Sequence, residues 1–221
     1  MAILKSGKYG NFYSEVYGET SAPLTESEMK VNAKYIYSYL TNEGWTISAI
    51  AGILGNMQAE STINPGRWES EEIFNYSRGF GLVQWTPATK YIEWATANGY
   101  NDPSHIDGNL ARIIYEVKNK LQWIATDSYD LTFEEFTKST SSVSSLAKAF
   151  LLNYERPADQ SSSAQNYRAS LAQNWYSYLR GVTPDEPETP ISPKRKKRKY
   201  KFLLFNANRR RKTWTKNNLI L

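Results

Sequence analysis

The chain has 221 residues, with 27 Lys and Arg, 22 Asp and Glu, a single His and no Cys. Without Cys, it can form neither a disulfide framework nor a thiol nucleophile. One His is too few for the usual zinc sites, and His105 has no nucleophile motif near it, so we interpret it as a surface residue. We therefore expect no metal and no cofactor. Among hydrolytic chemistries, those carried out by carboxylates remain.

The charges are divided unevenly along the chain. Residues 194–221 contain 12 of the basic residues and no acidic one, which leaves 15 basic and 22 acidic residues elsewhere, a net charge of −7. Before this segment, Pro recurs at every third position from Pro184 to Pro193, a spacing typical of a semi-rigid polyproline II spacer. We predict four parts: an N-terminal arm (1–24), a main domain (25–181), a Pro-rich linker (182–193) and a basic tail (194–221).

The first residues lack the basic and apolar regions of a secretory signal peptide, so we expect no signal peptide. No apolar run is long enough to span a bilayer. A protein of this kind that acts on a cell envelope is expected to reach it by another route.

The main domain begins with two well-marked helices. Thr25 and Glu28 form a capping box, and the apolar residues that follow recur on one helical face. Thr46 is the predicted N-cap of the second helix, which carries Glu60 near the edge of its apolar face. The turn signal at residues 64–66 ends this helix soon after Glu60.

The remainder of the main domain is predicted to be mostly helical, with one β-region. Residues 63–85 have little helical period, and apolar residues alternate within 80–85, so we predict a small β-ribbon after the second helix. Further helices are expected from Thr86-Pro87 to residues 98–99, over about 106–124, after Thr132, over about 143–155, and in a last segment that ends at Gly181. The predicted fold class is α+β, predominantly helical.

Glu60 is the candidate catalytic residue. A Glu at a helix end is usually solvated, but this one lies beside an apolar stripe, where desolvation favours the protonated form of a carboxyl group. A protonated carboxyl is what a glycosidase uses to protonate the departing sugar oxygen. The segment that follows Glu60 is rich in Gly, amide and aromatic groups, which suits the binding of a sugar chain.

Four motifs resemble the phage tail lysozyme family, in order and across the main domain. They are SEMKVNA at 27–33, GNMQAESTINPG at 55–66, GFGLVQWTP at 79–87 and YERPA at 154–158. A weaker likeness extends to lytic transglycosylases and goose-type lysozymes, in which an acid-Ser pair is followed by a Gly-Leu-x-Gln motif. In this chain the corresponding residues are Glu60-Ser61 and Gly81-Leu82-Val83-Gln84.

The resemblance implies a lysozyme-like fold and cleavage of the glycan strands of peptidoglycan, with Glu60 as the catalytic acid. It also implies that Gln84 and Tyr154 line the sugar cleft. Trp68 and Trp85 are further candidates for substrate binding, because indole rings stack on sugar faces. The alternative is that either Trp fills the core near the mouth of the cleft.

The identity of a second catalytic carboxylate is left open. The two carboxyl groups lie about 5 Å apart in retaining glycosidases and about 6.5–9.5 Å apart in inverting ones. Glu155 and Glu69 are the candidates, with Glu71 and Glu72 nearby. The alternatives are a solvated acidic loop at 69–72 and an ion pair between Glu155 and Arg156. Transglycosylases use a single acid, so hydrolysis and transglycosylation both remain possible.

We expect a lysozyme in the phage tail, carried in the virion, which opens the host wall locally as the phage enters. Its expected partners are peptidoglycan glycan strands and other phage tail proteins. The alternatives are a free endolysin that acts at lysis and a structural tail protein that has lost catalysis. The basic tail lies outside the resemblance. It is expected to be a solvated extension or to contact anionic wall polymer, a membrane surface or virion components.

Overall fold

The computed structural model describes residues 1–188, so the basic tail and the last part of the linker lie outside the described residues. Within 1–188 there are seven α-helices and a two-stranded sheet, which confirms the α+β, predominantly helical fold class. The helices are α1 (Glu26–Asn42), α2 (Ile47–Ser61), α3 (Thr89–Ala97), α4 (Ile106–Lys118), α5 (Phe133–Lys138), α6 (Val143–Phe150) and α7 (Ser162–Leu179).

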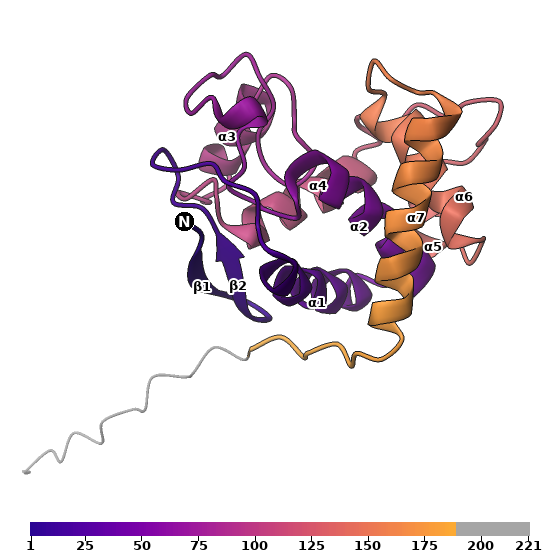
Figure 1. The fold of residues 1–221 in the computed structure, drawn as a ribbon, viewed down its shortest axis with the longest axis horizontal. Coiled ribbons are helices and arrows are strands. Elements are labelled where there is room, and N and C mark those ends of the chain that lie inside the picture. The colour runs from indigo at the N-terminus through magenta and orange to yellow at the C-terminus, as the bar shows by residue number, and fades with distance from the viewer. Residues whose placement is uncertain (189–221) are drawn as a thin grey trace, which may run out of the picture. The chain divides into compact units, whose positions relative to one another are not determined.

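Helix α2 lies at the centre of the fold and contacts α1, α6 and α7 (Figure 1). It begins at the predicted cap, since the side chain of Thr46 accepts a hydrogen bond from the backbone N–H of Ala49 at 3.2 Å. It ends where Thr62 and Ile63 both adopt a left-handed conformation, each with φ of 55°. Two such residues in succession stop a helix. Glu60 therefore lies in the last turn of a helix whose apolar residues are buried.

Gly55 lies where the backbone of α7 packs closely against α2. A Cβ atom at this position would lie 2.6 Å from the backbone N of Ala172 and 2.6 Å from the carbonyl oxygen of Arg168. Both atoms belong to the backbone of α7, so a side chain at position 55 requires the two helices to move apart.

Gly55→Ala should lower the free energy of unfolding by about 1–3 kcal/mol, the usual cost of overpacking. This loss is expected even though Ala is a better helix former than Gly by about 1 kcal/mol. Gly181→Ala is the control, because the nearest atom to a Cβ there is 3.6 Å away. Urea unfolding of both variants measures the difference. Equal stability of the Gly55→Ala protein and wild type would show that the helices separate without cost.

Most predicted helix starts agree with the structure. Both capping boxes are present, Thr25 with Glu28 and Thr132 with Glu135. One predicted start is wrong: α3 begins at Thr89, three residues after the expected cap, and the Thr86-Pro87 peptide bond that precedes it is cis.

The predicted end of the fourth helix is also wrong. Helix α4 ends at Lys118, whereas the apolar period continued to Ile124. The chain turns after the helix, with φ of 53° at Lys120 and 64° at Gln122. Leu121 and Ile124, which lie within the predicted helix, are 40% and 60% exposed.

The regular strands lie at the N-terminus. Strand β1 (Ile3–Gly7) pairs antiparallel with β2 (Gly10–Ser14), and residues 1–24 belong to the same compact unit as the helices. The pairing predicted within 63–85 is limited to isolated bridges, of Phe80 with Trp68 and with Trp85. Left-handed residues interrupt this segment, so the alternating pattern does not extend into a regular ribbon.

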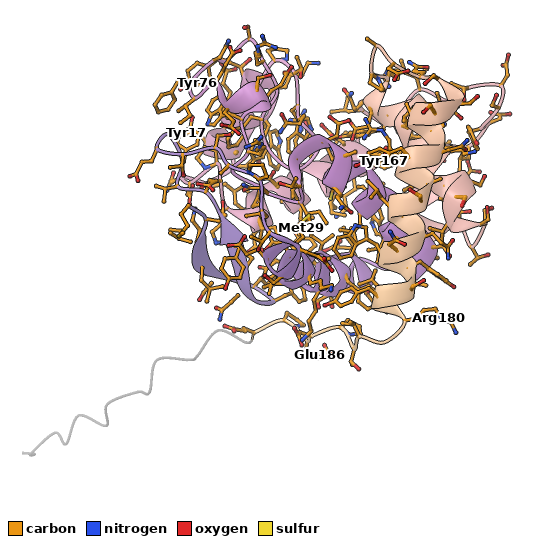
Figure 2. All side chains as sticks on the ribbon, viewed as in Figure 1. Tyr17, Met29, Tyr76, Tyr167, Arg180 and Glu186 are labelled. Atoms are coloured by element: carbon orange, nitrogen blue, oxygen red, sulfur yellow. The ribbon has the colours of Figure 1, made fainter. Side chains whose placement is uncertain are left out.

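The described part of the linker, residues 182–188, runs along α1 toward the hairpin of β1 and β2 (Figure 1). The backbone N–H of Asp185 donates to Ser38 Oγ at 2.8 Å, and its carboxylate lies 2.8 Å from Lys34 Nζ. Figure 2 labels Glu186 in this segment. These contacts attach the first residues of the linker to the helical unit.

Candidate active site

A pocket of about 420 Å³ lies at the C-terminal end of α2, and we refer to it as the site pocket. Its side chains come from α2, from residues 67–86 and from residues 155–157. They are Glu60, Arg67, Glu69, Ser70, Gln84, Thr86, Glu155, Arg156 and Pro157. The pocket thus brings together Glu60, Gln84, Glu155 and Glu69, four of the residues that the sequence suggested. A larger hollow of about 500 Å³, beside α1 and α7, contains none of them.

Glu60 is held by an arginine from α7. Arg168 Nη2 donates to Glu60 Oε1 at 2.6 Å, and the two side chains are 12% and 20% exposed. The sequence suggested that an apolar surrounding alone would shield Glu60. The structure instead places a charged partner beside it, so burial by apolar groups is not sufficient to describe its environment.

Ser61 fixes the end of α2 to the loop that carries Gln84. Its hydroxyl donates to the carbonyl oxygen of Leu82 at 2.8 Å. The backbone N–H of Leu82 in turn donates to Asn109 Oδ1 at 2.9 Å, and Asn109 is fully buried on α4. The loop therefore has a defined position relative to Glu60.

Gln84 adopts a left-handed conformation, with φ of 49°. Its side-chain Nε2 donates to the carbonyl oxygens of Gly81, at 2.8 Å, and of Arg67, at 3.1 Å. Its Oε1 is buried and has no hydrogen-bond partner among residues 1–188. An amide that is fixed through its nitrogen retains an acceptor for another group.

Glu155 ends a π-helical turn, Leu151–Glu155, that continues α6. Such turns are frequent at functional sites. Its Oε1 is buried without a hydrogen-bond partner among the described residues. Burial raises the pKa of this carboxyl well above its usual range, and the nearby charge of Glu60 raises it further, while Arg168 and Arg156 oppose the rise. Glu155 is thus a carboxyl group that favours its protonated form.

Arg156 does not form the ion pair with Glu155 that one interpretation of the sequence predicted. Its Nη1 donates to the backbone carbonyl oxygens of Gln122 and Asn153, both at 2.5 Å. The left-handed conformation of Arg156, with φ of 48°, ends the π-helical turn at this point.

Glu69 lies at the pocket with both oxygens engaged. Its Oε2 accepts from the backbone N–H of Gly79 at 2.8 Å, and its Oε1 lies 3.2 Å from Arg78 Nη1. Glu71 and Glu72 do not line the pocket. These contacts assign Glu69 a role in shaping the loop, and they leave Glu155 as the better candidate for a second carboxyl.

Trp68 is not a wall of the pocket. The structure buries it completely, beside the rings of Phe80, Tyr17 and Tyr76. Figure 2 shows Tyr17 and Tyr76 on the same side of the molecule. A side chain without exposed surface cannot stack on a sugar, so the expected substrate contact of Trp68 is wrong and the alternative, core packing, is correct.

Trp85 and Tyr154 are buried as well, at 4% and 1% exposure, and neither lines the pocket. Trp85 stacks on Tyr91, with ring centroids 4.6 Å apart, and Tyr154 stacks on Phe150 at 4.4 Å. The predicted sugar contacts of Trp85 and Tyr154 are therefore wrong, and both residues pack in the core beside the site.

Sequence reasoning missed the two charged residues that organise these groups. Arg168 lies 108 positions from Glu60, and nothing in the sequence of α7 distinguishes it. Glu116 is 1% exposed and bonds with Trp85, Tyr154 and Arg112. The sequence does contain a sign that Glu116 is buried: it follows Ile113 by three residues, so the helical period places it on the apolar stripe of α4.

Residues 1–188 contain neither a cluster of metal ligands nor a membrane-spanning helix. No group of three or more His, Asp or Glu in this part of the chain is arranged to hold a metal ion. Of the helices described, none has the length and apolar character needed to cross a bilayer.

Comparison with known proteins identifies the family. The sequence profile described as phage tail lysozyme matches residues 31–179. The chain is 51% identical over 170 residues to morphogenesis protein 1 of Bacillus phage B103, an alignment that covers 77% of this chain and 44% of that protein. The chain thus spans less than half the length of this relative. It belongs to the phage tail lysozyme family.

Proposed function

We propose that the protein cleaves the glycan strands of peptidoglycan, and that Glu60 protonates the sugar oxygen that departs. One observation carries this proposal: two carboxyl groups with different surroundings, Glu60 and Glu155, line the same pocket together with Gln84. A pair of carboxyl groups at one bond is the usual arrangement in glycosidases.

The pair is suited to holding one proton. Two nearby carboxylates repel each other, so that one of them binds a proton at a higher pH than an isolated carboxyl would. In this pocket the raised pKa belongs to Glu155, and Arg168 balances the charge of Glu60. We propose that this shared proton passes through Glu60 to the glycosidic oxygen, and that the charge left on the pair stabilises the positively charged sugar.

We propose hydrolysis, with Glu155 as the second carboxyl. Glu69 is less suited to this role because both of its oxygens already have partners in the loop. Ring closure by the substrate itself is the competing reaction, since it requires only one acid.

The test is digestion of purified Gram-positive peptidoglycan by the full chain, followed by mass spectrometry of the products. Hydrolysis leaves free reducing ends, whereas transglycosylation leaves anhydro ends. A known lysozyme serves as the positive control on the same preparation. If the folded protein leaves the glycan strands intact while that lysozyme digests them, the chain has a structural role and no glycosidase activity.

We also propose that the protein is carried in the virion and acts on the host wall during infection, with other tail proteins as partners. The support is the family and the name of the relative, a morphogenesis protein. Mass spectrometry of purified virions tests this point. Absence of the chain from virions, together with its presence in lysates, would favour an endolysin.

A further inference from the structure

Two segments that contribute side chains to the site pocket are bonded to one buried carboxylate, that of Glu116. Glu116 accepts a hydrogen bond from Trp85 Nε1 on Oε1, at 3.0 Å, and one from the Tyr154 hydroxyl on Oε2, at 2.5 Å. Trp85 directly follows Gln84 in the chain, and Tyr154 directly precedes Glu155. Each bond therefore holds the side chain of a residue that is next in sequence to one that lines the pocket.

We infer that Glu116 is a positioning residue of this site, because its two oxygens join the segment that carries Gln84 to the segment that carries Glu155. The inference rests on the proposed function. Neither Trp85 nor Tyr154 reaches the pocket, so Glu116 acts through the residues beside them.

The local charges support a fixed position for Glu116. Arg112 Nε donates to Glu116 Oε1 at 2.8 Å from one turn earlier in α4. The guanidinium of Arg112 lies 5.4 Å from the ring centroid of Trp94 and 5.5 Å from that of Tyr115. The two rings also contact each other, with centroids 5.3 Å apart, so Arg112 packs against an aromatic pair that restricts its motion and makes it a fixed partner for the carboxylate.

Glu116 also has an electrostatic effect on the pKa of Glu155. The charged groups around Glu155 are Glu60 and Glu116, which raise its pKa, and Arg168 and Arg156, which lower it. Because Glu116 is buried, little solvent screens its charge from Glu155. Burial also raises the pKa of Glu116, against the bonds from Tyr154 and Arg112, so Glu116 carries this charge above that raised pKa. Loss of that charge should make Glu155 release its proton at a lower pH.

Tyr154→Phe tests the geometric part of the inference. It removes the hydroxyl that binds Glu116 and keeps the buried ring. We expect kcat on soluble glycan fragments of peptidoglycan to fall by about tenfold to a hundredfold, with little change in KM, because the displaced groups act on the chemical step. Trp85→Phe should also lower kcat, through the segment that carries Gln84.

Tyr35→Phe is the matched control. The Tyr35 hydroxyl donates to Asp107 Oδ1 at 2.6 Å, so a buried tyrosine again binds a carboxylate, here a partly exposed one, and no residue that contacts the pocket is involved. We expect this variant to lose stability as Tyr154→Phe does and to keep the kcat of wild type. Equal kcat values for both variants and wild type would overturn the inference.

Glu116→Gln tests the electrostatic effect of Glu116 on Glu155 with a readout that does not depend on activity. The amide retains an acceptor for Trp85 and removes the charge. In protein labelled with ¹³C at the Glu side-chain carboxyl groups, the titration midpoint of Glu155 measured by NMR should move to lower pH. An unchanged midpoint in the folded variant would overturn the electrostatic role of Glu116. If wild type shows no glycan cleavage while this midpoint moves, the proposed function fails and the coupling of Glu116 to Glu155 stands.

Discussion

Glu60→Gln should lower the rate of glycan cleavage by at least about a hundredfold, the lower range for removal of a general acid. Gln has the same shape as Glu, and its amide oxygen can still accept the hydrogen bond from Arg168 that now reaches Glu60 Oε1. The fold should therefore survive, while the proton that the sugar oxygen requires is lost. The measurement is the rate of reducing-end formation on purified peptidoglycan, with the thermal unfolding midpoint recorded on the same sample.

Glu72→Gln is the control for this variant. Glu72 lies in the loop that carries Glu69, pairs with Arg78 at 3.2 Å and does not line the pocket. Its activity should equal that of wild type. A Glu60→Gln protein with wild-type activity would show that another carboxyl protonates the sugar, and Glu155 would be the first to examine.

Local sequence signals predicted the helices well because the interactions that start a helix lie within four residues of each other. The two capping boxes and the cap at Thr46 are of this kind. The predicted starts and ends failed where the backbone adopts conformations that the residue type does not indicate. The turn after α4 is one such case, with left-handed Lys120 and Gln122.

The candidate site was predictable in part for the same reason. Glu60 and Gln84 occur in motifs, and Glu155 occurs in a third, so the sequence could name them without knowing how they meet. Arg168 and Glu116 contribute through contacts with residues distant in the chain, and such contacts follow only from the packing of α7 and α4. The burial of Trp68 has the same origin, because a sequence does not show which of its aromatic residues will cover it.

Glu155→Gln should stabilise the protein at pH 8 and leave its stability unchanged below pH 4.5. The ordinary pKa of the Glu155 carboxyl is 4.5, and burial raises it in the folded protein. Below pH 4.5 the group is protonated in both states. As the pH rises toward the raised pKa, the unfolded chain releases the proton and the folded protein retains it, so wild type loses about 1.4 kcal/mol of stability per pH unit. Gln does not titrate and escapes this loss.

If the pair holds the proton that the sugar receives, as we propose, the same variant should lose activity. The alkaline limb of its pH–rate profile should move to lower pH. At a fixed pH on that limb, the rate should fall by about tenfold for each pH unit of this displacement. Asp159→Asn supplies a control of opposite sign for stability. Hydrogen bonds from Ser161 lower the pKa of Asp159, so its ionised form stabilises the folded state above pH 3.8.

Urea unfolding of the three proteins at pH 4 and pH 8 separates these effects. At pH 8, Glu155→Gln should be more stable than wild type and Asp159→Asn less stable. A gain in stability that accompanies a loss of activity is expected where a buried group is retained for its chemistry rather than for its contribution to the fold. If Glu155→Gln is no more stable than wild type at pH 8, the Glu155 carboxyl is not held in its protonated form. The pair then has no proton to share, and Glu60 would have to supply it alone.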